Sequence, residues 1–245
     1  MSDQPALRRE TRYGMPAADQ VLFNRHYVLG YSYYFRQAKW ALEIVNPLVV
    51  DDDGEEEERQ DHFRPDYRLP EQFRADLVDY TGSGFDRGHL VSSANQIDTE
   101  IQNSETFLLS NMSPQAPQFN RGIWRKLESA IRTLNDRPSI LETYVICGPI
   151  FYFDQPVALI GDDDDNEVSI PIPNAYFKSV LTEDHRGKLA MYSFMLDNEA
   201  SSDDLENFMV ETEKVEQYAG IELWSELTGT KIRREKGRIR KMWDH

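Results

Sequence analysis

The chain has 245 residues and a formal net charge of −16 at pH 7, and 40% of its residues are hydrophobic and 11% aromatic. This content predicts a folded protein with a buried core and excludes a disordered chain. The chain has no apolar run of about 18 residues, so we exclude a transmembrane helix. It has only one cysteine, Cys147, so we also exclude an intrachain disulfide and a cysteine cluster for zinc.

The N-terminal part of the chain begins without the apolar stretch of a secretory signal, so we expect a cytoplasmic protein that does not bind membranes. Aromatic and β-branched residues follow in two runs, 26–35 and 39–46, with a short gap between them. This pattern is typical of an antiparallel β-hairpin.

Most of the negative charge lies in two short tracts, residues 51–58 and 162–167, which hold seven and five acidic residues. Without these twelve, 31 acidic residues remain against 27 basic ones, a net charge of −4. Like charges repel, so we expect both tracts to be solvated loops inserted into one domain. Near the C-terminus, residues 231–241 carry seven basic residues and one acidic residue, which fits either a solvated tail or a patch that contacts phosphate.

The middle of the chain alternates helical and polar segments. Residues 70–84 begin as a short helix and end in turn residues, and a helix is expected within 98–111. An irregular loop follows at 110–120. The clearest helix spans 120–137, because its apolar residues recur at intervals of three and four, at Ile123, Trp124, Leu127, Ala130, Ile131 and Leu134.

The second half is rich in expected strands, at 140–152, 166–173, 176–182 and 189–196, and ends with a short helix at 211–222. Cys147 lies in the first of them, where we expect a buried, inert thiol. Strands predominate and helices are inserted between them. The fold class is therefore α+β, with residues 1–245 forming a single domain around a largely antiparallel sheet.

One set of polar residues, between an expected strand and the long helix, has the chemistry needed to hydrolyse a phosphodiester. His89 offers an imidazole that can act as a base near neutral pH, and Arg87 offers a cation for the phosphate. Asn111, Asn120 and Glu128 supply amide and carboxylate oxygens, and Glu128 lies two turns into the helix at the margin of its apolar stripe. Magnesium prefers such oxygen ligands and keeps most of its waters.

Each of these residues also has a structural interpretation. His89 fits a hydrogen-bonded core histidine, and Asn120 fits the N-cap of the long helix. Glu128 fits a solvated helix position, and Arg87 fits an ion pair with one of the many carboxylates. Spacing alone does not decide between the two sets of interpretations.

Three longer motifs favour the catalytic interpretation: "GSGFDRGHLVSSAN", "TFLLSNMSPQAPQFNRGIWRKLE" and "YVICGPIF". Together they resemble the DNA/RNA non-specific endonuclease family, and most strongly its mitochondrial members. The resemblance covers about residues 13–229 and implies a ββα-metal nuclease core. The two acidic tracts and the basic tail at 231–241 have no counterpart in it.

The resemblance implies a role for each matching residue. His89 matches the general base that activates the attacking water. Asn120 matches the direct protein ligand of a magnesium ion, for which manganese can substitute, and Glu128 matches the carboxylate that holds this ion through water. Arg87 matches the motif arginine that neutralises charge on the phosphate, and Asn111 matches the asparagine that positions the histidine.

Three further residues have roles that the motifs specify less closely. Asp86 matches a structural orienter. The family has another arginine upstream that contacts phosphate, and both Arg59 and Arg64 fit it.

The function that the resemblance implies is a magnesium-dependent, sequence-non-specific endonuclease that leaves 5′-phosphate and 3′-hydroxyl ends on DNA and RNA. It also implies a homodimer. Since such an enzyme endangers its own cell, we expect an inhibitor, an activating partner or the acidic tracts to restrain it until programmed DNA degradation or anti-phage defence is triggered.

Alternatives of other classes stay open. One is a catalytically silent member of the same fold that binds nucleic acid or protein, and another is a DNA mimic, suggested by the low isoelectric point. For the tracts, the alternatives to regulation are solvating loops and adaptation to high salt.

Overall fold

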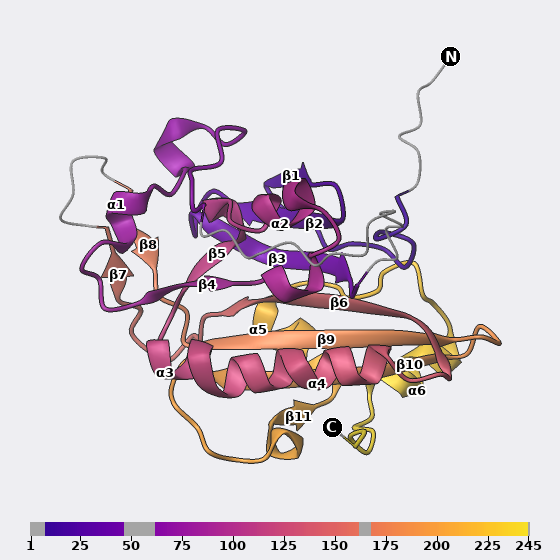
Figure 1. Cartoon of the computed structure of the whole chain (residues 1–245). Helices are drawn as coiled ribbons and strands as arrows, with labels where there is room; N and C mark the ends of the chain where they lie inside the picture. The colour runs from indigo at the N-terminus through magenta and orange to yellow at the C-terminus, as the bar shows by residue number, and fades with distance from the viewer. Residues whose placement is uncertain (1–7, 47–61, 162–167, 245) are drawn as a thin grey trace.

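A seven-stranded antiparallel sheet forms the centre of the residues that the computed structural model describes, 8–46, 62–161 and 168–244 (Figure 1). Its strand order is β1-β2-β3-β6-β9-β10-β11. The strands are β1 (Gln20–Phe23), β2 (Tyr27–Ser32), β3 (Gln37–Ile44), β6 (Ile140–Ile150), β9 (Ala175–Asp184), β10 (Leu189–Asp197) and β11 (Met209–Val210).

The two faces of this sheet belong to two different hydrophobic cores. Alternate residues of a strand point to opposite faces, so Tyr176 and Val180 of β9 pack in one core with the apolar stripe of helix α4 (Arg125–Asn135). Phe177 and Leu181 pack in the other core with helix α5 (Thr212–Ala219). The sheet is thus covered by helices on both faces, with α4 in front of the sheet in Figure 1, where it contacts β6.

A second, two-stranded sheet lies beside the first. Strand β4 (Asp86–His89) pairs antiparallel with β5 (Met112–Gln115), and the chain then turns into helix α3 (Pro117–Phe119), a π-type turn η4 (Asn120–Trp124) and α4. This gives a ββα unit. A third small sheet pairs β7 (Leu159–Ile160) with β8 (Ile170–Pro171).

The remaining elements are short helices that connect the strands. They are η1 (Glu71–Phe73), α1 (Leu77–Tyr80), η2 (Ser93–Asn95), α2 (Glu100–Glu105), η3 (Leu109–Asn111), η5 (Leu205–Phe208) and α6 (Thr230–Lys236). None of the helices in the described part of the chain is long and apolar enough to span a bilayer.

The α+β class with a largely antiparallel sheet is confirmed. The expected hairpin is formed by β2 and β3, and the strands expected at 140–152, 176–182 and 189–196 are β6, β9 and β10. β1 was not expected, and it extends the hairpin at the edge of the sheet. Of the strand expected at 166–173, only the two residues of β8 form a strand within the described part.

The prediction of an irregular loop at 110–120 is wrong, because this segment contains β5. This strand carries Pro114 and polar residues, so its conformation comes from pairing with β4 and not from its composition. The helix expected at 98–111 is also shorter: α2 begins after its N-cap Thr99 and ends at Glu105.

The helix expected at 120–137 is confirmed only from Arg125 to Asn135. Its first turn is interrupted at Gly122, whose φ of −104° and ψ of −107° are not helical. Glycine tolerates such a backbone conformation more readily than other residues.

Several predictions concern residues with limited or no structural description. Both acidic tracts lie outside the described residues, as does Arg59. The basic segment 231–241 is partly helical, in α6, and Lys236, Arg238 and Arg240 form ion pairs with Glu216 and Glu235. These pairs leave less of its positive charge available for phosphate than its composition suggests.

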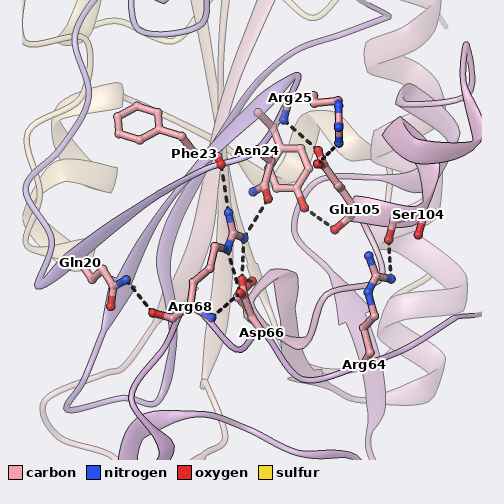
Figure 2. A network of polar contacts seen from close by, with 11 residues as sticks. Gln20, Phe23, Asn24, Arg25, Arg64, Asp66, Arg68, Ser104 and Glu105 are labelled. Carbon is pink, nitrogen blue, oxygen red and sulfur yellow. Dashed lines mark hydrogen bonds and ion pairs between the residues drawn. The ribbon is translucent and has the colours of Figure 1, made fainter. Parts of the chain in front are cut away.

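A buried carboxylate, Asp66, ties the loop before α1 to the edge of the sheet. Figure 2 shows Arg68 between Asp66 and the end of β1: its guanidinium donates to both Asp66 oxygens, at 2.8 and 2.6 Å, and to Asn24 Oδ1 at 2.9 Å. Ser110 Oγ donates to Asp66 Oδ2 at 2.7 Å from the other side. The network therefore holds the turn that leads into β5.

The pKa of Asp66 lies below its usual value. Burial alone would raise it, but the hydrogen bonds from Arg68 and Ser110 favour the ionised form and outweigh burial. A lowered pKa in the folded state gives stability that is present above the unfolded value, about 3.9, and is lost as the pH falls through the folded value.

We expect Asp66→Ala to lower the free energy of unfolding by about 2 kcal/mol at pH 7, because it removes the charge-assisted hydrogen bonds from Arg68 and leaves Ser110 Oγ without its buried acceptor. Urea unfolding followed by circular dichroism measures the loss. The matched control is Asp204→Ala, whose side chain is 89% exposed and should change stability by less than about 0.5 kcal/mol. Equal stability of the two variants at pH 7 would contradict this role for Asp66.

Candidate active site

A polar cleft of about 930 Å³ opens where β4, η2 and the start of α4 meet. Five of the residues singled out from the sequence line it: Asp86, Arg87, His89, Asn120 and Glu128. They come from a strand, a turn and a helix, so the fold brings together side chains that are up to 42 positions apart in the chain.

His89 ends β4, opposite Met112 of β5. Its ring lies against two aromatic rings, with centroid distances of 4.9 Å to Phe107 and 5.8 Å to Phe63. Its backbone carbonyl accepts a hydrogen bond from Trp124 Nε1 at 3.3 Å. The backbone and the ring are therefore both held, and the imidazole faces the cleft from a fixed support.

Asp86 connects β4 to the start of the long helix. Its Oδ2 accepts a hydrogen bond from Asn120 Nδ2 at 2.9 Å, and its two oxygens pair with Arg121 at 2.6 and 2.9 Å. Because the amide nitrogen of Asn120 points at this carboxylate, its amide oxygen is the atom available to a cation. The geometry of Asp86 agrees with an orienting role.

Asn120 does not cap the helix. Its φ of −57° and ψ of −51° are helical, and its backbone N–H already bonds to Ala116 O. The N-cap interpretation is therefore wrong, since an N-cap residue has non-helical angles and accepts a bond through its side chain.

Glu128 is partly buried on α4 and is not a solvated helix position. Its side chain is 13% exposed, its Oε1 lies 3.7 Å from Lys178 Nζ, and its Oε2 accepts a bond from Ser92 Oγ at 3.3 Å. Burial raises the pKa of Glu128, and the nearby positive charges of Lys178 and Arg132 offset only part of that effect.

The oxygens in the cleft fit a hard divalent cation. The amide oxygen of Asn120 is oriented by Asp86, and Glu128 Oε1 is buried with no hydrogen-bond donor among the described residues. No group of three or more His, Cys, Asp or Glu in the described ranges could hold a metal ion, so the protein would contribute few ligands. Magnesium suits such a site because it retains several of its waters.

Arg87 places its guanidinium over the ring of Phe63, with 4.3 Å from Cζ to the centroid. Within the described residues it makes no ion pair, so the interpretation of Arg87 as the partner of a carboxylate is not supported there. Its charge is directed to the cleft that it lines.

Asn111 lies behind the cleft and not in it. It is fully buried: its Oδ1 accepts from Val91 N at 3.0 Å, and its Nδ2 donates to Val91 O and Thr106 O at 3.0 and 2.9 Å. These bonds fix the segment directly after His89. The contacts fit positioning and do not fit direct participation in chemistry.

Arg64 is not brought into the cleft. Its Nη1 donates to the backbone carbonyl of Ser104 at 2.9 Å (Figure 2). The same atom donates to the carbonyl of His62 at 3.1 Å. The guanidinium thus stabilises the junction with α2, and the structure gives no support to a contact of Arg64 with substrate.

Sequence reasoning missed three arginines that line the cleft beside Glu128: Arg121, Arg125 and Arg132. The signal was present, because Arg125 and Arg132 are seven residues apart and thus share a helical face. Arg132 also donates to Asn95 Oδ1 at 3.0 Å. These arginines make the cleft cationic although the chain is acidic.

Two buried charges beneath the cleft were also missed. Glu43 of β3 accepts hydrogen bonds from Asn95 Nδ2 and Gln96 Nε2, at 3.0 and 3.2 Å, and Lys178 of β9 lies near it. Burial raises the pKa of Glu43 to about 7, against the opposing effect of Lys178. The signal was a single charged residue within each of two apolar stretches of strand, "WALEIV" and "YFKSVL".

Cys147 is buried, as expected. Its thiol donates to Leu90 O at 3.0 Å, and burial raises its pKa to about 12. A thiol that stays protonated at neutral pH is a poor nucleophile.

Comparison with known proteins gives one consistent result. The model of the family described as DNA/RNA non-specific endonuclease matches residues 6–229. The chain is 32% identical over 239 residues to "Endonuclease G, mitochondrial" of Caenorhabditis elegans, covering 92% of this chain and 75% of that protein. It is 33% identical over 223 residues to the human protein of the same name, covering 86% of this chain and 71% of that one.

A solved structure is similar over the whole fold. It is titled "Crystal structure of the EndoG/EndoGI complex: Mechanism of EndoG inhibition", and it matches with a TM-score of 0.81 and 28% sequence identity over 98% of this chain and 99% of that chain.

We expect Glu43→Gln to make folding less sensitive to pH. The pKa of Glu43 is raised in the folded state, to about 7, so its contribution is fully present below the unfolded value and is lost as the pH rises through about 7. From pH 5 to pH 8, the stability of Glu43→Gln should therefore rise relative to the parent by about 2 kcal/mol. Urea unfolding at both pH values measures this.

The control for this experiment is Glu206→Gln, an exposed glutamate on η5. It should follow the parent at both pH values. A constant difference between Glu43→Gln and the parent from pH 5 to pH 8 would show that Glu43 does not titrate in this range.

Proposed function

Because the chain belongs to the DNA/RNA non-specific endonuclease family, we propose that it is a magnesium-dependent endonuclease that hydrolyses DNA and RNA without sequence preference. Its resemblance to the family and to endonuclease G is confirmed, and so is its identity as a nuclease. One observation supports the proposed mechanism most: His89, Arg87, Asn120 and Glu128 line the same cleft.

In this mechanism His89 accepts a proton from the attacking water. The water oxygen forms a bond to phosphorus, the bond from phosphorus to the 3′ oxygen breaks, and the leaving 3′ oxygen takes a proton from a second water molecule, so the products are a 5′-phosphate and a 3′-hydroxyl. The aromatic contacts of His89 hold its ring in place for this step.

Asn120 is the proposed direct ligand of magnesium or manganese, and Glu128 the proposed partner of its waters. When bound, the cation supplies charge stabilisation for the phosphate oxygens in the transition state. Asp86 holds the amide of Asn120 by its nitrogen, so the oxygen is directed to the ligand position. Arg87, on β4, lines the same cleft and would add a second positive charge near the phosphate.

The lack of sequence preference follows from the charged side chains that line the cleft. Its charged groups are suited to phosphates, which are the same in every sequence, and Arg121, Arg125 and Arg132 extend this cationic surface along the helix. A catalytically silent binder would need neither His89 nor an oriented Asn120. A DNA mimic is disfavoured because the cleft itself is cationic.

We also propose how the nuclease activity is restrained, whether the chain forms a dimer and where the protein is located. The solved neighbour is a complex titled as one of inhibition, and this supports an inhibitor partner for the present chain as well. A homodimer, an activating partner and a trigger in programmed DNA degradation or anti-phage defence stay predictions. The cytoplasmic location also stays a prediction, because two relatives are named as mitochondrial proteins.

The first test is digestion of matched DNA and RNA with magnesium, with and without chelator. We expect the parent to cut both and chelator to stop it. His89→Ala should lose a factor of about 100 to 10,000 in rate, as expected for removal of a general base. His185→Ala, in an exposed turn, is the control and should cut like the parent. If His89→Ala cuts as fast as His185→Ala, the role of His89 is wrong.

The second test concerns the acidic tracts. If residues 51–58 or 162–167 restrain the enzyme, deleting them should raise the cleavage rate at low salt, because like charges repel the phosphate backbone, and the gain should shrink as salt screens the repulsion. Cleavage of plasmid over a salt series measures this. Equal rates for the deletion variants and the parent at every salt concentration would leave the tracts as solvating loops.

A further inference from the structure

Lys178 carries a buried ammonium directly beneath the cleft. The residue is 1% exposed and lies on the face of β9 that packs against α4. Its Nζ lies 3.7 Å from Glu128 Oε1, 4.2 Å from the centroid of the Trp124 ring and 3.4 Å from Leu90 O. A charge at such a site costs several kcal/mol in desolvation, which only well-placed partners offset.

The three partners of this ammonium all belong to segments that carry the site. Glu128 is the carboxylate on α4, Trp124 donates to the backbone carbonyl of His89, and Leu90 follows His89 in the chain. Lys178 therefore contacts the helix, its first turn and the end of β4 from one point on the central sheet. A hydrophobic residue of similar volume would fill the space but would hold none of the polar groups.

The carboxylate of Glu128 is held from two sides. Ser92 Oγ contacts Oε2, and Lys178 is the cation next to Oε1, an atom with no hydrogen-bond donor in the described part of the chain. Without Lys178, the carboxylate would lose the cation that lies 3.7 Å from its Oε1, and the positive charge of Arg132 on the same helix would act on it without that support.

We propose that Lys178 is a positioning residue for the reaction: its ammonium fixes the carboxylate of Glu128 on the floor of the cleft and so sets the affinity of the site for its divalent cation. This inference rests on the proposed function, because it assigns Glu128 to the cation site. Residues that orient metal ligands typically change metal affinity by a factor of about 10 to 100 when they are removed.

If Lys178 had a purely structural role, its removal would affect stability and cation affinity in a different way. Glu43 is the other buried carboxylate near Lys178, and it is also held by Asn95 and Gln96. If Lys178 only neutralises Glu43, then removing both charges together should restore both stability and cation affinity. If Lys178 positions Glu128, the double variant should recover stability and still bind the cation weakly.

The experiment measures Mn²⁺ binding to the full chain without nucleic acid, from the electron paramagnetic resonance signal of free Mn²⁺. We expect Lys178→Met and the double variant Lys178→Met with Glu43→Gln to bind Mn²⁺ at least about tenfold more weakly than the parent. The double variant should have the higher melting temperature of the two. Lys188→Met, at an exposed position after β9, is the control and should bind like the parent.

Cleavage assays give a second readout. The magnesium concentration for half-maximal cleavage should rise about tenfold in the folded double variant, and high magnesium should recover much of the rate. Parental Mn²⁺ affinity in the double variant, or unchanged or tighter binding in Lys178→Met, would overturn the proposal.

The failure of this proposal is distinguishable from failure of the proposed function. Asn120→Ala is the reference, and it should lose both Mn²⁺ binding and cleavage. If the parent binds and cuts, Asn120→Ala does neither, and the Lys178 variants match the parent, then only the inference about Lys178 is wrong. If the parent itself neither binds Mn²⁺ nor cuts nucleic acid, the proposed function is wrong.

Discussion

The antiparallel pairing of β4 with β5 is the constraint on which the cleft depends. The register places Asp86 opposite Gln115 and His89 opposite Met112. Since the chain leaves β5 at Gln115 and turns at once into helix, Asn120 arrives beside Asp86, which bonds its amide nitrogen. A slip of one residue would turn each side chain of β4 to the other face and separate this pair.

Packing behind the cleft keeps this arrangement rigid. Asn111 binds the backbone of Val91, and Trp124 donates to the carbonyl of His89, so the end of β4 is held from both the loop and the helix. Lys178 joins the same region to the central sheet. These contacts come from residues distant in the chain, and they combine a strand, a helix and a turn into a single unit.

Much of the fold was predictable because its large elements bury long apolar surfaces. β6, β9 and β10 are evident as runs of apolar and β-branched residues, and α4 is evident from the period of its apolar stripe. β5 was not predictable in this way, because a polar segment with a proline becomes a strand only through its partner β4. The break at Gly122 was missed for a related reason: the apolar spacing continues across it.

The site residues could be named because their motifs resemble those of a known family. Their contacts could not be predicted in this way. His89 and Asn120 were named from a motif, whereas the bond from Asn120 to Asp86 and the partial burial of Glu128 depend on tertiary structure. Net charge was a poor guide to the cleft, because the excess of acid lies largely in two tracts while arginines of η4 and α4 line the cleft.

The most direct test of the central claim is the position of a manganese ion, located by anomalous diffraction from crystals soaked in Mn²⁺. We expect one peak in the cleft at about 2.2 Å from Asn120 Oδ1, with Glu128 farther away and linked through water. A cleft that stays empty at high Mn²⁺, or an ion bound in the cleft without Asn120, would contradict the assignment of Asn120 as the metal ligand.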